Sequence, residues 1–139
     1  MKQLEVVAAI IIYNEQILGM QRNKGDYDYI SYKFEFPGGK IEKGETKTEA
    51  LMRELQEEMN ISINIMDKDF FFRCYHKYPD FEVTIDSFLC YVDSPEFVQK
   101  EHIAHKWLHL KELDDLDWAG ADIPIVERLL EMKKDGLSR

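Results

Sequence analysis

The chain is organised around one stretch, residues 39–61, which runs Gly39-Lys40-Ile41-Glu42-Lys43-Gly44-Glu45-Thr46-Lys47-Thr48-Glu49-Ala50-Leu51-Met52-Arg53-Glu54-Leu55-Gln56-Glu57-Glu58-Met59-Asn60-Ile61. It reads as a glycine-rich loop followed by a helix over residues 46–59. Each residue of an α-helix turns by about 100°, so Glu54, Glu57 and Glu58 share one side. Their charges repel, and a multivalent cation would reverse that penalty. Hard carboxylate oxygens suit Mg²⁺ or Mn²⁺, and Mg²⁺ completes its shell with water and substrate phosphates.

These residues resemble the signature of the Nudix hydrolase family, GX5EX7REUXEEXGU, where U is an aliphatic residue. The matching positions are Gly39, Glu45, Arg53, Glu54, Leu55, Glu57, Glu58 and Ile61. Asn60 departs from the pattern, because the family usually has glycine there. Asparagine tolerates a positive φ angle and can end a helix in the left-handed conformation, so we expect the same turn. The resemblance implies an α/β fold, a Nudix-type α/β/α sandwich with a central mixed sheet.

The resemblance also implies which residues of this stretch carry chemistry. The metal ligands would be Glu54, Glu57 and Glu58, one of which also helps to activate water. The backbone carbonyl of Gly38 is a further expected ligand, because glycine allows the chain to approach an ion closely. Arg53 is expected to orient the carboxylates through charge-assisted hydrogen bonds, and with Glu45 to hold the loop against the helix. The alternative is that these glutamates only form a solvated helix face.

A second acidic residue is expected to join the site from a distant loop. Glu101 precedes Trp107 by six residues, and the chain resembles the MutT subgroup here, whose loop glutamate binds metal or takes part in water activation. Glu96 is the alternative counterpart. His102 and His105 flank this position and could titrate near neutral pH, but we interpret both as surface residues.

The same resemblance indicates where a nucleotide would bind. The candidate phosphate contacts are Arg22 and Lys40. The candidate base contacts are Glu35 and Asp122, with Phe34, Trp118 and the tyrosines of residues 27–32 as stacking partners. Each position also has a simpler interpretation: a surface cation for Arg22 and Lys40, a strand residue for Glu35, and core packing for the aromatic residues.

Asp122 decides which base the sequence favours. MutT-type enzymes specific for 8-oxoguanine nucleotides have asparagine at the position that the resemblance assigns to Asp122. Asparagine both donates and accepts hydrogen bonds, whereas an ionised aspartate only accepts, so Asp122 should prefer a donor-rich edge such as the cytosine amino group. Residues 121–124, Ala-Asp-Ile-Pro, resemble the CTP pyrophosphohydrolase branch. Alternatively, Asp122 only caps the last helix.

Regular elements are expected in a mixed order, which favours a mixed sheet flanked by helices. Strands are predicted at residues 4–13, 16–21, 33–36, 61–66, 70–78, 81–92 and 106–110, and helices at residues 46–59 and from about 122 to 134. Asn14-Glu15 is a plausible hairpin turn. The segment 23–32 is predicted to be a loop, and Pro37 ends the strand before it reaches the glycines.

The bulk composition limits the remaining possibilities. A length of 139 residues suits one domain, residues 1–139, and the net charge of −9 disfavours binding to a nucleic-acid polymer. Cys74 and Cys90 form no CxxC pair and are predicted to be reduced core residues. The longest apolar run, residues 6–13, is too short to span a membrane, and no signal peptide is recognisable, so a cytoplasmic location is the default. The oligomeric state stays open.

The leading hypothesis is a Mg²⁺-dependent enzyme that hydrolyses a nucleoside triphosphate to the monophosphate and pyrophosphate. The resemblance implies water attack on the β-phosphorus, and CTP, dCTP or a modified pyrimidine nucleotide is the favoured substrate. An 8-oxo-dGTP sanitising diphosphatase is the alternative within the same class. A non-catalytic Nudix domain that senses a nucleotide is the alternative from another class, although such domains often lose glutamates that this chain keeps.

Overall fold

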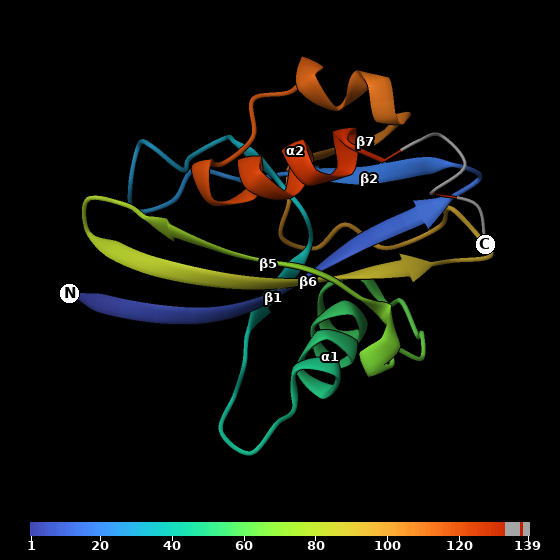
Figure 1. Cartoon of the computed structure of the whole chain (residues 1–139), viewed down its shortest axis with the longest axis horizontal. Coiled ribbons are helices and arrows are strands. Elements are labelled where there is room, and N and C mark those ends of the chain that lie inside the picture. Colours follow the sequence, from blue (N-terminus) through green and yellow to red (C-terminus); the bar gives the residue numbers. More distant parts are fainter. Residues whose placement is uncertain (133–136, 138–139) are drawn as a thin grey trace.

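The computed structural model describes residues 1–132 and 137 (Figure 1). Its strands are β1 (Lys2–Tyr13), β2 (Gln16–Gln21), β3 (Phe34–Glu35), β4 (Gly38–Lys40), β5 (Phe70–Lys77), β6 (Phe81–Tyr91) and β7 (Ala104–Leu108). Its α-helices are α1 (Lys47–Met59) and α2 (Ile123–Leu130), and short 3₁₀ helices occupy η1 (Asp67–Asp69), η2 (Leu110–Asp115) and η3 (Gly120–Asp122).

The strands form one mixed sheet with the central order β3-β2-β1-β6-β5. β1 and β6 are parallel along almost their whole length, and β1 is antiparallel to both β2 and β4. β7 pairs with β2. Helix α1 covers one face of the sheet and α2 covers the other (Figure 1). The predicted α/β/α sandwich with a mixed sheet is confirmed.

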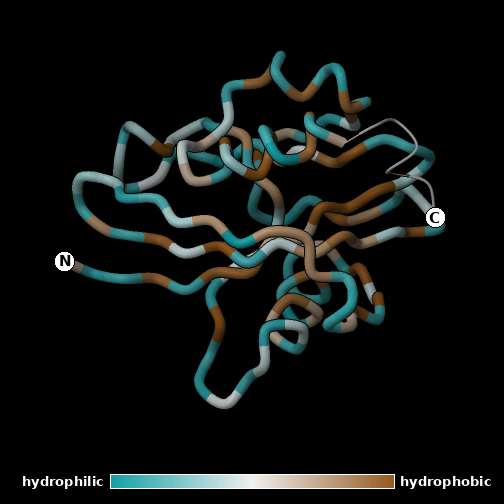
Figure 2. Tube along the Cα trace, in the orientation of Figure 1, coloured by the Kyte–Doolittle hydropathy of each residue, from teal (hydrophilic) through white to brown (hydrophobic). Residues whose placement is uncertain are grey.

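Residues 7–12 of β1 are buried on both faces, which explains the uninterrupted apolar sequence of this part of the strand. Successive strand side chains point to opposite faces. Val7, Ala9 and Ile11 therefore pack in the layer that contains the α1 residues, whereas Ala8, Ile10 and Ile12 pack in the layer that contains the α2 residues. Figure 2 shows this apolar band at the centre of the molecule. β1 therefore lies between the two core layers and packs against both.

Helix α1 begins and ends at the residues that the sequence predicts. Thr46 and Glu49 form a reciprocal capping box, in which the Glu49 amide donates to the Thr46 hydroxyl and the Thr46 amide donates to the Glu49 carboxylate. Asn60 adopts the left-handed conformation with φ 54° and ends the helix. The expected left-handed turn, with asparagine in place of the usual glycine, is confirmed.

The β1–β2 hairpin turns through two residues with positive φ, Asn14 at 51° and Glu15 at 63°. This pair of conformations is typical of a type I′ turn, whose twist matches that of antiparallel strands. The predicted turn is confirmed, although a glutamate at positive φ is unusual.

Three sequence predictions need correction. Residues 61–66 form no strand: their alternating isoleucines pack against the α1 layer, but the backbone there has no strand partner. The glycine-rich segment after Pro37 contains the short strand β4, because Gly38 and Gly39 pair with β1. α2 ends at Leu130, and the part of its predicted extension at residues 133–134 lies outside the described residues.

Cys74 and Cys90 are both free thiols, as predicted. Cys90 is buried, and burial raises the pKa of its thiol to about 12. Among the described residues, neither α-helix has the length and the apolar character that crossing a bilayer requires.

Candidate active site

Arg53 lies at the centre of a network that joins the glycine-rich loop to helix α1. Its Nε donates to Glu45 Oε2 at 2.7 Å and its Nη2 to Glu45 Oε1 at 3.0 Å. Nη1 donates to Glu54 Oε1 at 3.0 Å and to Glu57 Oε2 at 3.2 Å, and Nη2 also reaches the Lys40 carbonyl. Bidentate, charge-assisted contacts of this kind fix carboxylate orientation. The guanidinium therefore orients two of the three helix glutamates.

Strand β4 approaches α1 and β1 so closely that its glycines leave no room for side chains. A Cβ on Gly38 would overlap the Val7 carbonyl oxygen, and a Cβ on Gly39 would overlap the carboxylate of Glu54. Glu54 is thus held between a bare backbone and Arg53. Because glycine has no side chain, the backbone of β4 can lie this close to the Glu54 carboxylate.

Negative charge accumulates where α1 faces the loop before β7. Burial raises the pKa of Glu54, and the charges of Glu57 and Glu101 add to the effect despite the opposing influence of Arg53. Burial also raises the pKa of Glu58, together with the charge of Glu101 and a hydrogen bond between these two carboxyl groups. A hard divalent cation would relieve this repulsion, so the donor set fits Mg²⁺ or Mn²⁺.

The carboxylates are near one another, but they do not form a closed ligand set. Within residues 1–132 and 137, no group of three or more His, Cys, Asp or Glu side chains is arranged to hold an ion. Arg53 engages Glu54 and Glu57, and the Glu57 side chain is 58% exposed. A bound Mg²⁺ would take one or two of these carboxylates and draw its other ligands from water and phosphate.

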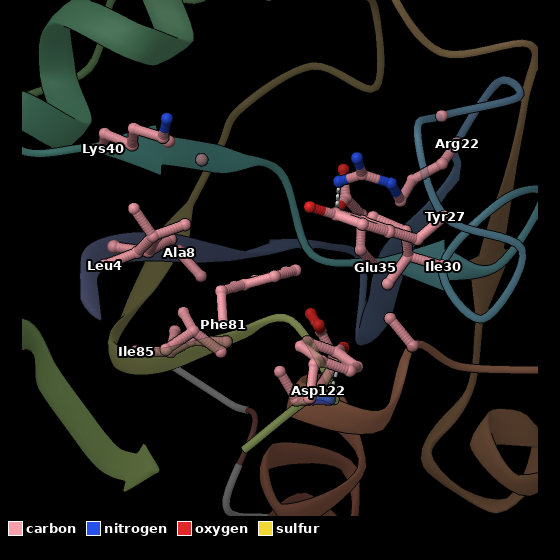
Figure 3. Close-up of a pocket in the computed structure, with 18 of the residues that line it drawn as sticks. Leu4, Ala8, Arg22, Tyr27, Ile30, Glu35, Lys40, Phe81, Ile85 and Asp122 are labelled. Carbon is pink, nitrogen blue, oxygen red and sulfur yellow. Dashed lines mark hydrogen bonds and ion pairs between the residues drawn. The ribbon is translucent and has the colours of Figure 1, made fainter. Parts of the chain in front are cut away.

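We call the space lined by Glu54, Glu58 and Glu101 the acidic cleft. A cavity of about 500 Å³ opens beside it, on the other side of β4. Its apolar floor comes from β1 and β6, and its polar groups come from the β2 end, β3 and the start of α2. Residues that line it include Leu4, Val6, Ala8, Arg22, Tyr27, Glu35, Lys40, Phe81, Ile85 and Asp122 (Figure 3). Pockets with an apolar body and a few convergent polar groups are typical of small-molecule sites.

Glu35 lies between the cavity and the acidic cleft. Its Oε1 accepts from Arg22 Nη1 at 2.9 Å, as Figure 3 shows, and its Oε2 lies 2.8 Å from His102 Nε2. Burial opposes ionisation of Glu35, but the hydrogen bond to His102 and the charge of Arg22 outweigh it and lower the pKa of Glu35. Among the described residues, no protein group accepts from the buried Nε of Arg22. The Arg22 side chain as a whole is 37% exposed.

Asp122 forms the polar end of the cavity. The segment before it pairs with β3, since Phe34 N donates to Asp117 O and Ala119 N donates to Phe34 O, both at 2.8 Å. The Asp122 carboxylate accepts from Phe36 N at 3.0 Å and makes no capping hydrogen bond to α2. The capping interpretation of Asp122 is wrong.

The protonation of Asp122 also differs from the expectation. Asp122 is buried, and burial together with the nearby charge of Glu35 raises the pKa of Asp122 well above its usual value. Raised pKa values favour the neutral acid, which can donate as well as accept a hydrogen bond. The expectation of an ionised residue that only accepts is therefore not supported.

The loop of residues 23–32 is fastened over the cavity by aromatic stacking. The ring of Tyr27 stacks on Tyr29, and Tyr29 stacks on Tyr78, with 5.1 Å between ring centroids in both pairs. The Tyr29 hydroxyl donates to Asp80 Oδ2 at 2.8 Å. The loop of residues 23–32 and the β5–β6 hairpin therefore close the cavity together.

Comparison with known proteins agrees with this geometry. The NUDIX domain profile matches residues 3–129 of the chain. The 8-oxo-dGTP diphosphatase of Escherichia coli (strain K12) is 33% identical over 129 residues, covering 93% of this chain and 98% of that protein. The chain belongs to the Nudix hydrolase family. Because its relatives are named for hydrolytic activities, their similarity also supports that the chain is an enzyme of this family.

Two further Nudix comparisons bear on the substrate and the fold. The CTP pyrophosphohydrolase of Escherichia coli (strain K12) is 32% identical over 143 residues, covering 96% of each chain. The solution structure of the E. coli ORF135 protein has a TM-score of 0.78 and 30% sequence identity, covering 94% of this chain and 90% of that one. The chain is thus similar at nearly equal identity to Nudix hydrolases that act on different bases.

The structure brings six of the predicted site residues together in one cleft, and Glu57 is not among the residues that line it. Gly38, Glu54, Glu58, Glu101, Arg22 and Glu35 line a common cleft. Glu96 lies instead in a separate exposed depression, so Glu101 is the loop carboxylate that faces α1. Lys40 is exposed at the rim of the cavity.

The predicted stacking role of Phe34 and Trp118 does not fit their placement. Both side chains are buried in the α2 layer of the core, and neither lines the cavity. The Trp118 ring stacks on Phe36, and its Nε1 donates to the Leu113 carbonyl. They support the cavity wall from behind, and Tyr27 is the aromatic residue of the loop that reaches the cavity.

Sequence reasoning missed two residues of the site. His102 was interpreted as a surface residue, but its side chain is 14% exposed and contacts Glu35. Lys100 received no role, yet its ammonium group binds the end of α1 through Glu57 O at 2.9 Å and Asn60 Oδ1 at 3.0 Å. Their position on either side of Glu101 was the signal that could have identified them.

Proposed function

We propose that the chain hydrolyses a nucleoside triphosphate to the nucleoside monophosphate and pyrophosphate in a Mg²⁺-dependent reaction. The favoured substrates are CTP, dCTP or a modified pyrimidine nucleotide. The observation that carries the proposal is that the acidic cleft and the cavity share walls formed by Arg22, Glu35 and Gly38. One ligand can therefore place a polyphosphate tail in the cleft and a base in the cavity.

Each part of this chain has a task in the proposed reaction. Glu54, Glu57, Glu58 and the Gly38 carbonyl are the candidate metal ligands. Mg²⁺ bound there would neutralise phosphate oxygens as charge develops on them. Arg22, which is partly exposed and lines both the cleft and the cavity, would contact the phosphate chain. Arg53 stays with Glu45 and orients the carboxylates without touching substrate.

The bond that breaks joins the β-phosphorus to the oxygen that bridges it to the α-phosphorus. Water attacks the β-phosphorus, its oxygen ends in pyrophosphate, and the nucleoside monophosphate leaves. One proton of the water passes to a carboxylate, and the hydrogen-bonded pair Glu58 and Glu101 is the candidate acceptor.

A second candidate substrate is 8-oxo-dGTP, and the protonation of Asp122 supports it. A neutral Asp122 would offer one donor and one acceptor, as an asparagine does. Such a pair matches the adjacent amino group and ring nitrogen of cytosine, and equally the adjacent N–H and carbonyl of a guanine. The similarity to an 8-oxo-dGTP diphosphatase adds to this candidate.

A panel of canonical and oxidised nucleoside triphosphates, assayed for pyrophosphate release with and without Mg²⁺, tests the proposal. We expect metal-dependent turnover that is highest for a cytidine or modified pyrimidine nucleotide, and ¹⁸O from labelled water should appear in pyrophosphate. Turnover of 8-oxo-dGTP hundreds of times better than that of dCTP would select the second candidate. Label in the monophosphate would exclude attack at the β-phosphorus.

Substitution of a metal ligand separates hydrolysis from nucleotide sensing alone. Glu57→Gln should lower pyrophosphate release by about 100-fold or more, because a neutral amide is a weaker ligand for Mg²⁺ than a carboxylate. The fold should persist, since Glu57 is mostly exposed. Glu127→Gln, at an exposed position of α2, is the matched control. Nucleotide binding without turnover in the unaltered protein would favour a non-catalytic sensor.

A further inference from the structure

The loop that carries Glu101 is fastened on both sides of that residue. On one side Lys100 Nζ donates to Glu57 O and to Asn60 Oδ1. On the other side His102 Nε2 contacts Glu35 Oε2 on β3. Glu101 itself lines the same cleft as Glu58, and the two carboxyl groups interact there. The three consecutive residues thus reach three different parts of the proposed site.

The Lys100 contact completes the end of α1. The last carbonyls of a helix lack partners within the helix, and a cation there interacts favourably with the helix dipole. The last turn of α1 contains no basic residue of its own, and Lys100 supplies that cation from the loop. Val98 N also donates to Met59 O at 3.0 Å. The loop is therefore docked on the helix that bears the candidate metal ligands.

Asn60 gives this docking a feature specific to this chain. The family signature usually has glycine at this position, and glycine has no side chain that could accept a hydrogen bond. Here the left-handed turn is formed by an asparagine, and its Oδ1 accepts from Lys100. The departure from the signature thus adds an anchor for the loop.

The His102 contact ties the same loop to the wall shared with the cavity. Glu35 has one oxygen engaged by Arg22 and the other by His102. Beyond this point Ile103 N donates to Gln21 O, and β7 begins its pairing with β2. Glu101 consequently has little freedom to leave the cleft as long as both neighbours are bound.

We propose that Lys100 and His102 are positioning residues that clamp Glu101 against Glu58, and that Asn60 acts through Lys100. The inference rests on the proposed function, in which Glu101 serves the metal or the attacking water. Neither Lys100 nor His102 is assigned a contact with substrate. Their effect should therefore appear in kcat and in the order of the loop.

Amide hydrogen exchange of the metal-free protein tests the clamp without any turnover. In Lys100→Ala and His102→Ala, peptides that cover residues 98–103 should exchange faster, because each substitution removes one attachment of the loop. Lys106→Ala is the matched control, since Lys106 is exposed on β7, outside the loop. Unchanged exchange in both variants would overturn the clamp.

Kinetics then show whether the clamp matters for chemistry. Both alanine variants should lower kcat about tenfold with KM changed less than twofold, as expected when a group is misplaced without loss of binding. His102→Gln, which keeps a donor for Glu35, should recover part of the loss. Equal loss in Lys106→Ala, or a rise in KM with kcat intact, would overturn the assignment.

Asn60→Gly separates positioning from folding. Glycine adopts the left-handed turn at no steric cost, so the melting temperature should not fall. The kcat should still fall about threefold, because Lys100 loses one acceptor. In the Lys100→Ala background the same substitution should have no further effect, and an additive loss would overturn the link between these residues.

Different measurements test the proposed function and the clamp. Absence of Mg²⁺-dependent turnover in the unaltered protein would overturn the proposed function, and faster exchange in the variants would still support the clamp. Normal turnover with unchanged exchange would overturn the clamp alone.

Discussion

Arg53 and Glu45 form a two-point ion pair, with Nε to Oε2 at 2.7 Å and Nη2 to Oε1 at 3.0 Å. Both side chains are largely covered, at 20% and 19% exposure. Hydrogen bonding from Arg53, and from the Glu42 amide, lowers the pKa of Glu45. The pair fastens the glycine-rich loop to α1, and the remaining nitrogen of Arg53 is then aimed at Glu54 and Glu57.

Arg53→Lys should reduce kcat by about 10- to 100-fold with little change in the fold, because an ammonium group lacks the planar fork that holds several carboxylates at once. Steady-state kinetics and circular dichroism would check this. Arg128→Lys is a suitable control, since Arg128 forms an exposed ion pair with Glu131 on α2. Full activity of Arg53→Lys would show that the two-point geometry is dispensable.

Gly39→Ala should inactivate the protein more than it destabilises it. The added methyl group would displace the carboxylate of Glu54, which lies against the backbone of β4. Gly44→Ala is the informative partner, because Gly44 has open space around it but a φ of 87°. That variant should lose about 1 kcal/mol of unfolding free energy and keep its kcat. Loss of kcat in Gly44→Ala together with loss of stability alone in Gly39→Ala would contradict the proposed position of Glu54.

Mg²⁺ should raise the melting temperature of the protein. The crowded carboxylates repel in the absence of a cation, and a ligand that binds only the folded state adds about 2.7 kcal/mol at 100 times its Kd. Glu58→Gln should reduce the shift, and chelation with EDTA should reverse it and abolish turnover. A thermal shift titration measures the effect, and an equal shift in Glu58→Gln and the unaltered protein would remove Glu58 from the ligand set.

Asp122 should make stability depend on pH in a definite direction. Burial raises the pKa of Asp122 in the folded state, so its contribution is fully present below the ordinary carboxyl pKa of about 3.9 and is lost as pH rises through the raised value. Asp122→Asn removes this titration, so its stability relative to the unaltered protein should improve toward alkaline pH. Urea unfolding at several pH values would show it, and Asp114→Asn, at an exposed site, is the control.

The same variant tests how Asp122 contacts a base. An amide keeps one donor and one acceptor, so kcat/KM of Asp122→Asn at pH 7 should stay within about threefold for the preferred nucleotide if the neutral acid is the active form. A loss of 100-fold would mean that the ionised form makes the contact.

The sequence predicted the helix α1, its capping box and the turn at Asn60, because these depend on residues close to one another in the chain. It also predicted that the helix glutamates lie together. It did not predict β4, since two glycines give no strand signal and their pairing depends on the approach of β1. Residues 61–66 show the converse: their apolar alternation is genuine, but a strand also needs a partner edge.

The protonation of Asp122 and the role of His102 were beyond local reasoning for a related reason. Both depend on Glu35, which is 87 residues from Asp122 and 67 residues from His102 in the sequence. The aromatic residues show the same limit, because composition alone did not distinguish Trp118, which lies in the core, from Tyr27, which lines the cavity.

β1 restricts how this enzyme could acquire a new specificity. Val7, Ala9 and Ile11 pack in the α1 layer, whereas Leu4, Val6 and Ala8 form part of the cavity floor. An inserted or deleted residue in β1 would exchange the side chains of its two faces. Such a change in the cavity floor would therefore also disrupt the packing against α1. Changes in substrate preference should therefore accumulate in segments 23–32 and 117–122, which border the cavity from outside the strand.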